Sequence, residues 1–394
     1  MNRRQGIDAA VVGGGVVGAA CALALARQGL EVVLVEAATP SPWRQDRPDL
    51  RVFALAADNA GLLDSLGVWS EARHARLHPY RRMKVWDAAG GGELAFDADA
   101  FGRRELGWIV ENGLLVDRAW AALEAAGVRV HAPARVVALE SSGDDDVARL
   151  RLDDGSQLQA RIAIAADGAQ STLRELAGLR VERHDYGQRG VVGYVATEHG
   201  HEATAWQRFL PTGPLAFLPC GDGSSSIVWT LPHAEAARVL ALDDDAFSRE
   251  LTRAFDARLG AARPLSPRAA FPLRRQLVES QVSGRVLVLG DAAHVVHPLA
   301  GQGVNLGLRD VAALAAMVAD ANANRGDWAA PSRLLRWARE RRSENTLAAY
   351  AFDGINRVYA SDGVASTLLR GPLLGLAGRL PPVAHFLWRR AAGL

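Results

Sequence analysis

The sequence predicts an α/β fold: a domain with a parallel sheet covered by helices, interleaved with a second domain on an antiparallel sheet and followed by C-terminal helices. Three observations predict it. A strand–turn–helix–strand unit opens the chain, two later apolar strands end in aspartate beside glycine, and the segments between them alternate as antiparallel strands do. A length of 394 residues leaves room for two or three domains.

The opening unit is typical of a dinucleotide-binding, Rossmann-like fold. Residues 7–12 form an apolar run suited to a buried strand, an alanine- and leucine-rich helix ends near Arg27, and residues 31–36 form a second strand. Glu36 ends that strand where a carboxylate that accepts ribose hydroxyls is expected. The intervening turn fits G-x-G-x-x-G, with Gly13, Gly15 and Gly18 at the fixed positions.

Each glycine of that turn has a physical reason. The first makes the turn tight, the second lets backbone N–H groups approach a pyrophosphate at the helix N-terminus, and the third lets the helix pack close to the strand. A glycine-rich turn without a ligand is the alternative, but the surrounding strand, helix, strand and acid favour the binding interpretation.

Hydropathy offers a different interpretation of residues 9–26, an uncharged run that a signal peptide or short membrane helix would also show. Four glycines in the run and Asp8 before it favour a buried strand, turn and helix. Two distant cysteines, Cys21 and Cys220, make neither a disulfide framework nor a cysteine zinc site, so we expect a reducing, cytoplasmic location. With 45 basic and 44 acidic side chains, a dedicated nucleic-acid binder is excluded.

Two further glycine–acid pairs follow predicted parallel strands. Asp167 and Gly168 follow the strand at 161–166, and Asp291 follows the strand at 285–289. Each aspartate alone is more often a turn residue. Together with Glu36 they predict a long cofactor contacted by three stretches of chain at the carboxyl ends of the strands.

The segment 290–310 is the most specific part of the chain. We expect a loop up to Gly303 and then a helix, whose N-terminus presents backbone N–H groups to a ring that becomes anionic, as a reduced flavin does. Glycines at 301 and 303 permit close approach of a flat ring.

These residues resemble a known family, the class A flavin monooxygenases, and within it the aromatic hydroxylases of ubiquinone biosynthesis. The segment from His297 to Gly307, with Asp310, matches that subgroup's signature, and similarity covers about residues 7–350. Supporting segments are Arg51–Leu55, Gly107–Asn112 and Gln207–Pro219.

The resemblance implies FAD as cofactor and NADH or NADPH as a transient reductant. It implies hydroxylation, through a flavin hydroperoxide and O2, of the aromatic ring of a polyprenylated phenol; it leaves open the ring position and the choice of nicotinamide. The implied cofactor contacts are Gly13, Gly15, Gly18, Glu36, Arg51, Asp167, Gly168, Asp291, Pro298, Gly301, Gln302, Gly303, Val304 and Asn305.

The same pattern predicts the domain division. We expect residues 1–75, 100–180 and 276–330 in the FAD-binding domain, residues 76–99 and 181–275 in the substrate-binding sheet domain, and residues 331–394 in a C-terminal helical region.

Candidates for the substrate site are large apolar residues of the predicted sheet. Phe217 and Pro219 would lie on a strand running toward the flavin, with Trp206 and Phe209 on a neighbouring strand. Plain core packing is the alternative for each. His297 precedes the flavin loop and is a candidate for moving the phenol proton; a histidine that only bonds backbone is the alternative. No metal site is predicted, because His294 and His297 lack a third ligand at matching spacing.

The tail at 363–394 is basic, apolar and without acids. It either packs on the FAD-binding domain or contacts a membrane surface or a partner of ubiquinone biosynthesis. Two rival functions remain open: another flavin oxidoreductase of this fold, such as a soluble-aromatic hydroxylase or prenyl reductase, and a non-catalytic prenyl-binding chaperone.

Overall fold

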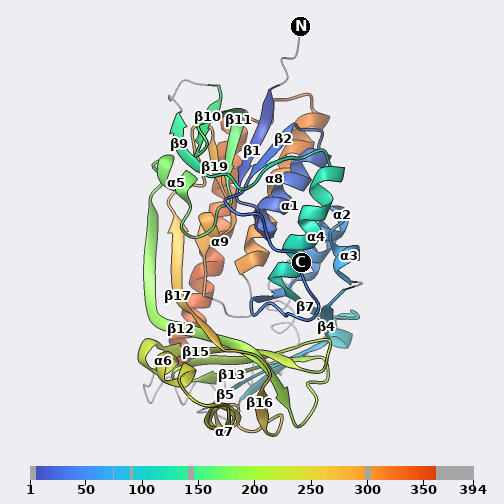
Figure 1. The fold of residues 1–394 in the computed structure, drawn as a ribbon, viewed down its shortest axis with the longest axis vertical. Helices are drawn as coiled ribbons and strands as arrows, with labels where there is room; N and C mark the ends of the chain where they lie inside the picture. Colours follow the sequence, from blue (N-terminus) through green and yellow to red (C-terminus); the bar gives the residue numbers. More distant parts are fainter. Residues whose placement is uncertain (1–5, 74, 89–91, 141–145, 298–302, 361–394) are drawn as a thin grey trace.

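The computed structural model describes residues 6–73, 75–88, 92–140, 146–297 and 303–360. Within them the chain builds an upper part around one sheet and a lower part around another, joined by two long strands (Figure 1). These strands are β12 (Val181–Thr197) and β17 (Ala269–Val278).

The upper sheet is parallel along its centre. Strand β1 pairs in parallel with β2 and β11, and β11 pairs in parallel with β19. Strands β9 and β10 form an antiparallel arm on β11, and the sheet continues to β8 and β18 at its edges. The bounds are β1 (Ile7–Val12), β2 (Val32–Val35), β8 (Arg129–His131), β9 (Val136–Glu140), β10 (Ala148–Leu152), β11 (Gln157–Ala165), β18 (Val282–Ser283) and β19 (Val286–Val288).

Alternation along β1 buries both faces of this sheet. Ala9 and Val11 pack under helices α1 (Val16–Arg27), α4 (Asn112–Ala125) and α8 (Gly303–Ala323). Ala10 and Val12 pack under the β9–β10 arm and helix α5 (Thr172–Leu176). Residues 9–26 are therefore the buried strand, turn and helix that the sequence predicts. Among the described helices, none has the length and apolar character to cross a bilayer.

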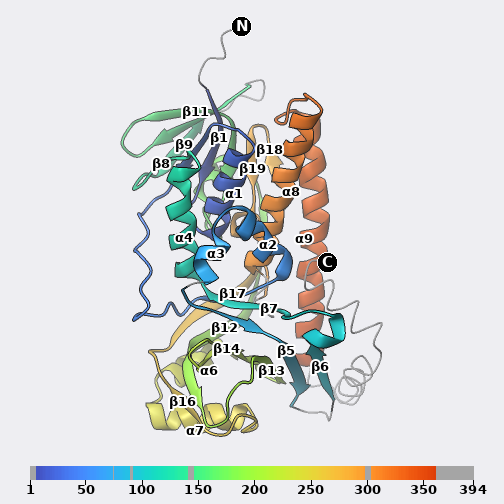
Figure 2. The ribbon, with the colours of Figure 1, turned by 90° about the vertical axis from the view of Figure 1, so that its right-hand side faces the viewer.

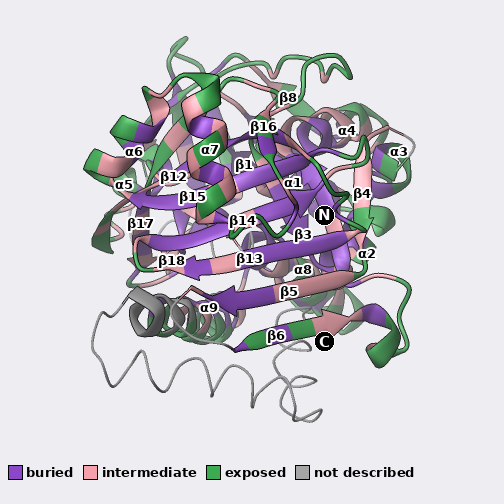
Figure 3. Cartoon of the chain, turned by 90° about the horizontal axis from the view of Figure 1, so that it is seen from below, coloured by how far each residue is buried: buried purple, intermediate pink, exposed green. Residues whose placement is uncertain are grey.

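The lower sheet runs in the order β20-β17-β12-β15-β14-β13-β5-β6, with β16 beside β12 (Figure 3). Its pairs are antiparallel except β13 with β5. Helices α6 (His233–Leu240) and α7 (Asp244–Ala254) cover one face. The other bounds are β5 (Arg82–Asp87), β6 (Glu93–Asp97), β13 (Thr204–Leu210), β14 (Gly213–Pro219), β15 (Ser225–Pro232), β16 (Ala262–Pro264) and β20 (His294–Val295).

A small third sheet lies on the other face of the lower sheet. It consists of β3 (Val52–Leu55), β7 (Gly107–Glu111) and β4 (Leu77–Tyr80). Ala54 of β3 packs with Ala205 and Leu218 of the lower sheet. The small sheet joins segments that the sequence analysis assigned to different domains, and the domain division itself stays a prediction.

Helices α2 (Ala57–Ser65) and α3 (Trp69–Arg73) follow β3, and α9 (Pro331–Ala360) lies beside α8 (Figure 2). Of the predicted helical region at 331–394, residues 331–360 form this one helix, and the tail at 363–394 lies outside the described residues.

A buried carboxylate fastens α8 to its surroundings. Asp310 accepts hydrogen bonds from the backbone N–H of Gly290 at 3.1 Å and from Nε of Arg341 at 2.9 Å, and it lies 2.6 Å from Nε2 of His294. Asn345 of α9 donates to it at 3.0 Å. Burial alone would raise the pKa of Asp310, but the contacts with His294 and Arg341 outweigh burial and lower the pKa to about 2.

We expect Asp310→Asn to lower the free energy of unfolding by about 3–5 kcal/mol, because it removes the buried carboxylate that pairs with His294 and Arg341 and leaves Arg341 only the more exposed Glu344. In the wild type, the lowered pKa contributes stability above the ordinary aspartate pKa of 3.8, and this contribution is lost as the pH falls toward 2. Urea unfolding at pH 7 and between pH 4 and 2 measures both effects.

The matched control is Asp320→Asn on the same helix, because Asp320 is exposed and its surface ion pair with Arg333 contributes little to stability. Equal losses in the two variants would contradict the central role of Asp310.

Candidate functional site

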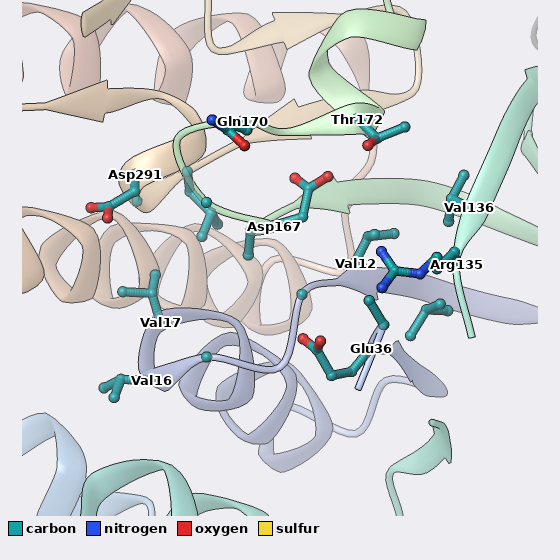
Figure 4. A pocket seen from close by; sticks show the side chains of 18 of the residues that line it. Val12, Val16, Val17, Glu36, Arg135, Val136, Asp167, Gln170, Thr172 and Asp291 are labelled. Atoms are coloured by element: carbon teal, nitrogen blue, oxygen red, sulfur yellow. The ribbon is translucent and has the colours of Figure 1, made fainter. Parts of the chain in front are cut away.

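A cleft of about 560 Å³ lies at the carboxyl edge of the upper sheet. The register explains its position: Val12 of β1 is level with Val35 of β2 and Ala165 of β11, so the residues after these strands meet at one edge. Figure 4 shows Glu36, Asp167 and Asp291 along the cleft, with Asp167 between the other two. The structure therefore brings the three predicted acids together.

The three glycines of the first turn differ in their surroundings. Gly13 has a φ of +106°, and a Cβ there would lie 2.3 Å from the carbonyl oxygen of Ala166. A Cβ on Gly18 would lie 1.9 Å from the carbonyl oxygen of Gly13. Gly15, at the N-cap of α1, has no atom within 4 Å of such a Cβ and lines the cleft. Gly13 and Gly18 thus serve packing, whereas Gly15 leaves open space at a helix N-terminus.

Glu36 is fixed by the turn that it faces. Its carboxylate accepts hydrogen bonds from the backbone N–H of Gly14 and, at 3.1 Å, from that of Ala38. Arg135 and Val136 line the same end of the cleft (Figure 4). These two residues were not predicted, because they follow the edge strand β8 and carry no glycine–acid signal.

Asp167 holds the loop that follows β11. Its carboxylate accepts hydrogen bonds from the Ser171 hydroxyl and from the backbone N–H of Leu173, while Gly168 adopts a φ of +81°. Arg174, fully buried, donates to the carbonyl oxygens of Ala169 at 3.1 Å and Ala292 at 2.9 Å. Arg174 therefore ties the Asp167 loop to the turn that carries Asp291. Arg174 was not predicted from the sequence; Ser171, the helix N-cap three residues earlier, is the signal that marks this turn.

Asp291 lies opposite Arg51 across the cleft. The Arg51 guanidinium is 3.6 Å from its carboxylate, and both side chains are substantially exposed. Such an ion pair is worth little by itself, so both groups remain available to a ligand.

The start of α8 lies at the edge of the cleft. Gly303 is its first residue and Val304 lines the cleft. The side chain of Asn305 is turned elsewhere: its Oδ1 accepts from the backbone N–H of Ala56 at 2.9 Å, and its Nδ2 donates to the carbonyl oxygen of Ala54 at 2.8 Å. Asn305 thus braces β3 with its side chain. Pro298, Gly301 and Gln302 lie outside the described residues.

Strand β3 separates the cleft from a second, apolar cavity of about 110 Å³. Phe53 lines the cleft, whereas Val52 and Ala54 line the cavity, because successive side chains of a strand point to opposite faces. Arg51 lines both spaces. Facing walls of the cavity include Tyr80, Met83, Ala205, Gln207, Ala216, Leu218 and Thr230.

The predicted substrate residues are mostly placed elsewhere. The rings of Phe217 and Phe255 stack between the lower sheet and α7, with their centroids 3.8 Å apart. Pro219 lies two residues further along β14, so its side chain is on the same face of the strand as Phe217. Trp206 contributes to the cavity wall but packs its ring against Trp86 in the same core as Phe217.

Phe209 is on the same face of β13 as the cavity, but it lies further along the strand, where it packs with Val85 and Leu94. Both faces of the lower sheet are buried, so apolar alternation could not tell which parity faces the cavity. Phe217 and Phe209 lie in apolar clusters of the lower sheet, and their neighbours Ala216, Leu218 and Gln207 line the cavity.

His297 is buried beside β12, with its imidazole edge-on to the ring of Tyr186 at 5.0 Å. Burial lowers its pKa to about 4, so the imidazole is neutral at pH 7. Within the described residues neither ring nitrogen has a hydrogen-bond partner. His294 is instead bound to Asp310, and no group of three metal-ligating side chains occurs in the described ranges.

We expect Gly18→Ala to destabilise the fold by about 3 kcal/mol or more, because its methyl group would overlap the Gly13 carbonyl. Gly15→Ala should fold normally but bind the cofactor about tenfold more weakly, because its methyl group enters space that the ligand would use. Thermal unfolding and titration of flavin into the cofactor-free protein separate the two effects. A Gly15→Ala protein with unchanged affinity would refute this role.

Curated relatives resemble the chain over nearly its whole length. It is 38% identical over 351 residues to the 3-demethoxyubiquinol 3-hydroxylase of Escherichia coli (strain K12), which covers 89% of each chain. It is 36% identical to the ubiquinone hydroxylase UbiL of Rhodospirillum rubrum, over 98% of this chain and 89% of the relative. The human mitochondrial ubiquinone biosynthesis monooxygenase COQ6 is 34% identical, over 92% and 87%.

Solved structures share the fold. The p-nitrophenol 4-monooxygenase PnpA of Pseudomonas putida DLL-E4 superposes with a TM-score of 0.79 over 99% of both chains at 19% identity. HpxO of Klebsiella pneumoniae, crystallised with FAD and uric acid, gives 0.74 over 98% and 96% at 20% identity. Residues 6–349 match the family described as FAD binding domain. The chain therefore belongs to this FAD-dependent monooxygenase family, in the group of the ubiquinone-biosynthesis hydroxylases.

Proposed function

We propose that this protein hydroxylates the aromatic ring of a polyprenylated phenol in ubiquinone biosynthesis, using FAD, O2 and NADH or NADPH. One observation carries the proposal: an apolar cavity of ring-like size shares the wall formed by β3 and Arg51 with a dinucleotide cleft. The names of the relatives supply the pathway and the class of substrate.

The residues of the cleft fit FAD. Gly15 leaves a cradle that a side chain would fill, next to the N-terminus of α1, where backbone N–H groups suit a pyrophosphate. Glu36 and Asp291 offer carboxylate oxygens to sugar and ribityl hydroxyls. Asp167 and Gly168 shape the loop between them, and Gly303 and Val304 border the end near β3.

The overall reaction balances in atoms and electrons. One oxygen atom of O2 is inserted into a ring C–H bond, the other leaves as water, and NADH or NADPH supplies a hydride that enters with one proton. Bound FAD supplies the redox chemistry that connects the nicotinamide with O2. The chain itself holds the phenol ring, excludes water and accepts a proton.

The cavity residues suit that task. Met83, Ala216 and Leu218 present apolar surface to a ring and exclude water. Burial raises the pKa of Tyr80 to about 12, so its hydroxyl stays protonated at pH 7. We propose His297 as the proton acceptor: it is not among the residues that line the cleft or the cavity, but its imidazole beside Tyr186 is neutral and its nitrogens have no partner among the described residues. Membrane or partner contact through residues 363–394 belongs to the proposal as well, and this tail lies outside the described residues.

Complementation tests the function. Expression in an Escherichia coli strain lacking its 3-demethoxyubiquinol 3-hydroxylase, and in strains blocked at each other ring hydroxylation, should restore ubiquinone in at least one strain. Mass spectrometry of the quinone precursors then identifies the ring position, because the accumulated precursor lacks one oxygen atom.

The matched control for complementation is Gly15→Asp, whose negative charge at the helix N-terminus should expel the cofactor pyrophosphate. A yellow, folded wild-type protein that restores no strain would rule out the ubiquinone assignment and favour a different flavin oxidoreductase. A colourless protein that releases no flavin would favour a prenyl-binding chaperone.

The role of His297 has its own test. We expect His297→Gln to lower the rate of phenol hydroxylation by about 100-fold, with unchanged flavin content, because a positioned base is lost. Since the histidine pKa is about 4, the wild-type rate should show no loss attributable to this group between pH 8 and 5. An equally active variant would leave His297 with a packing role against Tyr186.

A further inference from the structure

One polar side chain stands out on the wall of the apolar cavity. Gln207 is only 7% exposed, yet its side chain lines the cavity between Ala205, Met83 and Ala216. Its strand neighbours in register are Ala216 of β14 and Val85 of β5, and neither side chain offers a hydrogen bond.

The Gln207 amide has no hydrogen-bond partner among the residues that the structure describes, whereas Gln276 and Gln281, also buried, each use at least one amide atom on the chain. Gln276 donates to the carbonyl oxygen of Ala169 at 3.1 Å and accepts from Arg183 at 3.1 Å. Gln281 donates to the carbonyl oxygen of Val288 at 3.2 Å. The amide of this largely buried side chain faces the cavity, so its hydrogen-bonding capacity is left for whatever occupies the cavity.

The position of Gln207 on the cavity wall makes a substrate ring a suitable hydrogen-bond partner for its amide. The alanines at 205 and 216 leave room in front of the amide, and the opposite wall is β3, with the cofactor cleft behind it. A ring between the two walls has one edge at Gln207 and another toward the cleft. An amide can both donate to and accept from a phenol hydroxyl, since it carries an N–H donor and a carbonyl acceptor.

We propose that the Gln207 amide binds the phenol hydroxyl of the substrate and thereby sets which ring carbon faces the cofactor. This rests on the proposed function and deepens it, because it makes Gln207 a specificity-determining residue. Tyr80 and Thr230 also line the cavity. Tyr80 lies on β4 of the small sheet, and Thr230 lies on β15, two strands away from β13.

The test compares binding of two ligands to the oxidised holoprotein, measured by the change in flavin absorbance. One ligand is a short-chain prenylated phenol, and the other is the same ring with hydrogen in place of the hydroxyl. We expect the wild type to bind the phenol about tenfold more tightly and Gln207→Leu to bind the two equally. During turnover, Gln207→Leu should divert reducing equivalents from ring hydroxylation to hydrogen peroxide, because the ring is no longer held in one orientation.

Measurements of thermal unfolding control for effects of the substitutions on stability. Gln207→Leu should unfold at the same temperature as the wild type or higher, because the amide it removes makes no hydrogen bond to the described part of the chain. Gln188→Leu is the matched control: its Nε2 donates to the carbonyl oxygen of Thr212 at 2.9 Å in the same sheet, away from the cavity. This variant should lose stability and keep the tenfold preference.

Different results would refute the proposed function and the role of Gln207. A wild type that binds neither ligand would refute the proposed function. A wild type that prefers the phenol, together with a Gln207→Leu variant that keeps this preference, would overturn the role of Gln207 alone. Loss of the preference in Tyr80→Phe, with Gln207 intact and Gln207→Leu unaffected, would move the role to Tyr80.

Discussion

The buried carboxylate of Asp310 is the interaction on which the shape of the cofactor cleft depends. It accepts from the backbone N–H of Gly290, which begins the turn that carries Asp291, and it also binds His294 and Arg341. One group thereby fixes a strand end, the helix whose first turn borders the cleft, and the long helix behind it. Burial of the Asp310 charge is energetically acceptable only because several hydrogen-bond donors surround it. The elements that supply these donors must therefore pack around Asp310 at the same time.

Strand β3 is the second element on which the site depends, because it separates the cofactor cleft from the apolar cavity. It is only four residues long, and its alternation assigns Phe53 to the cleft and its two neighbours to the apolar cavity. Asn305 holds this strand from the α8 side through the backbone of Ala54 and Ala56. The partition between cofactor and substrate spaces is therefore positioned by the same helix that Asp310 anchors, and any movement of α8 would change both spaces together.

The sequence predicts most of what lies at the strand ends and little of what lies inside the lower sheet. Glu36, Asp167 and Asp291 could be placed together because parallel strands bring their carboxyl ends to one edge. Phe217 was assigned to the substrate site and instead packs under α7, because a strand buried on both faces carries no sign of which parity faces a cavity. The partners of Asp310 were equally out of reach, since Arg341 and Asn345 are brought to it only by the packing of α9 on α8.

The polar side chains considered for the cleft and the cavity divide into those that already make hydrogen bonds within the chain and those left open to a ligand. Glu36 and Asp167 already accept hydrogen bonds from their own loops, which fixes the cleft before any cofactor arrives. Asn305, although part of the signature segment, uses its amide on β3 in the same way. Gln207 differs, because it is buried, faces a cavity and has no partner in the described part of the chain. Preorganised groups set where the cofactor lies, so discrimination among substrates falls to a group whose hydrogen bonds are still to be made.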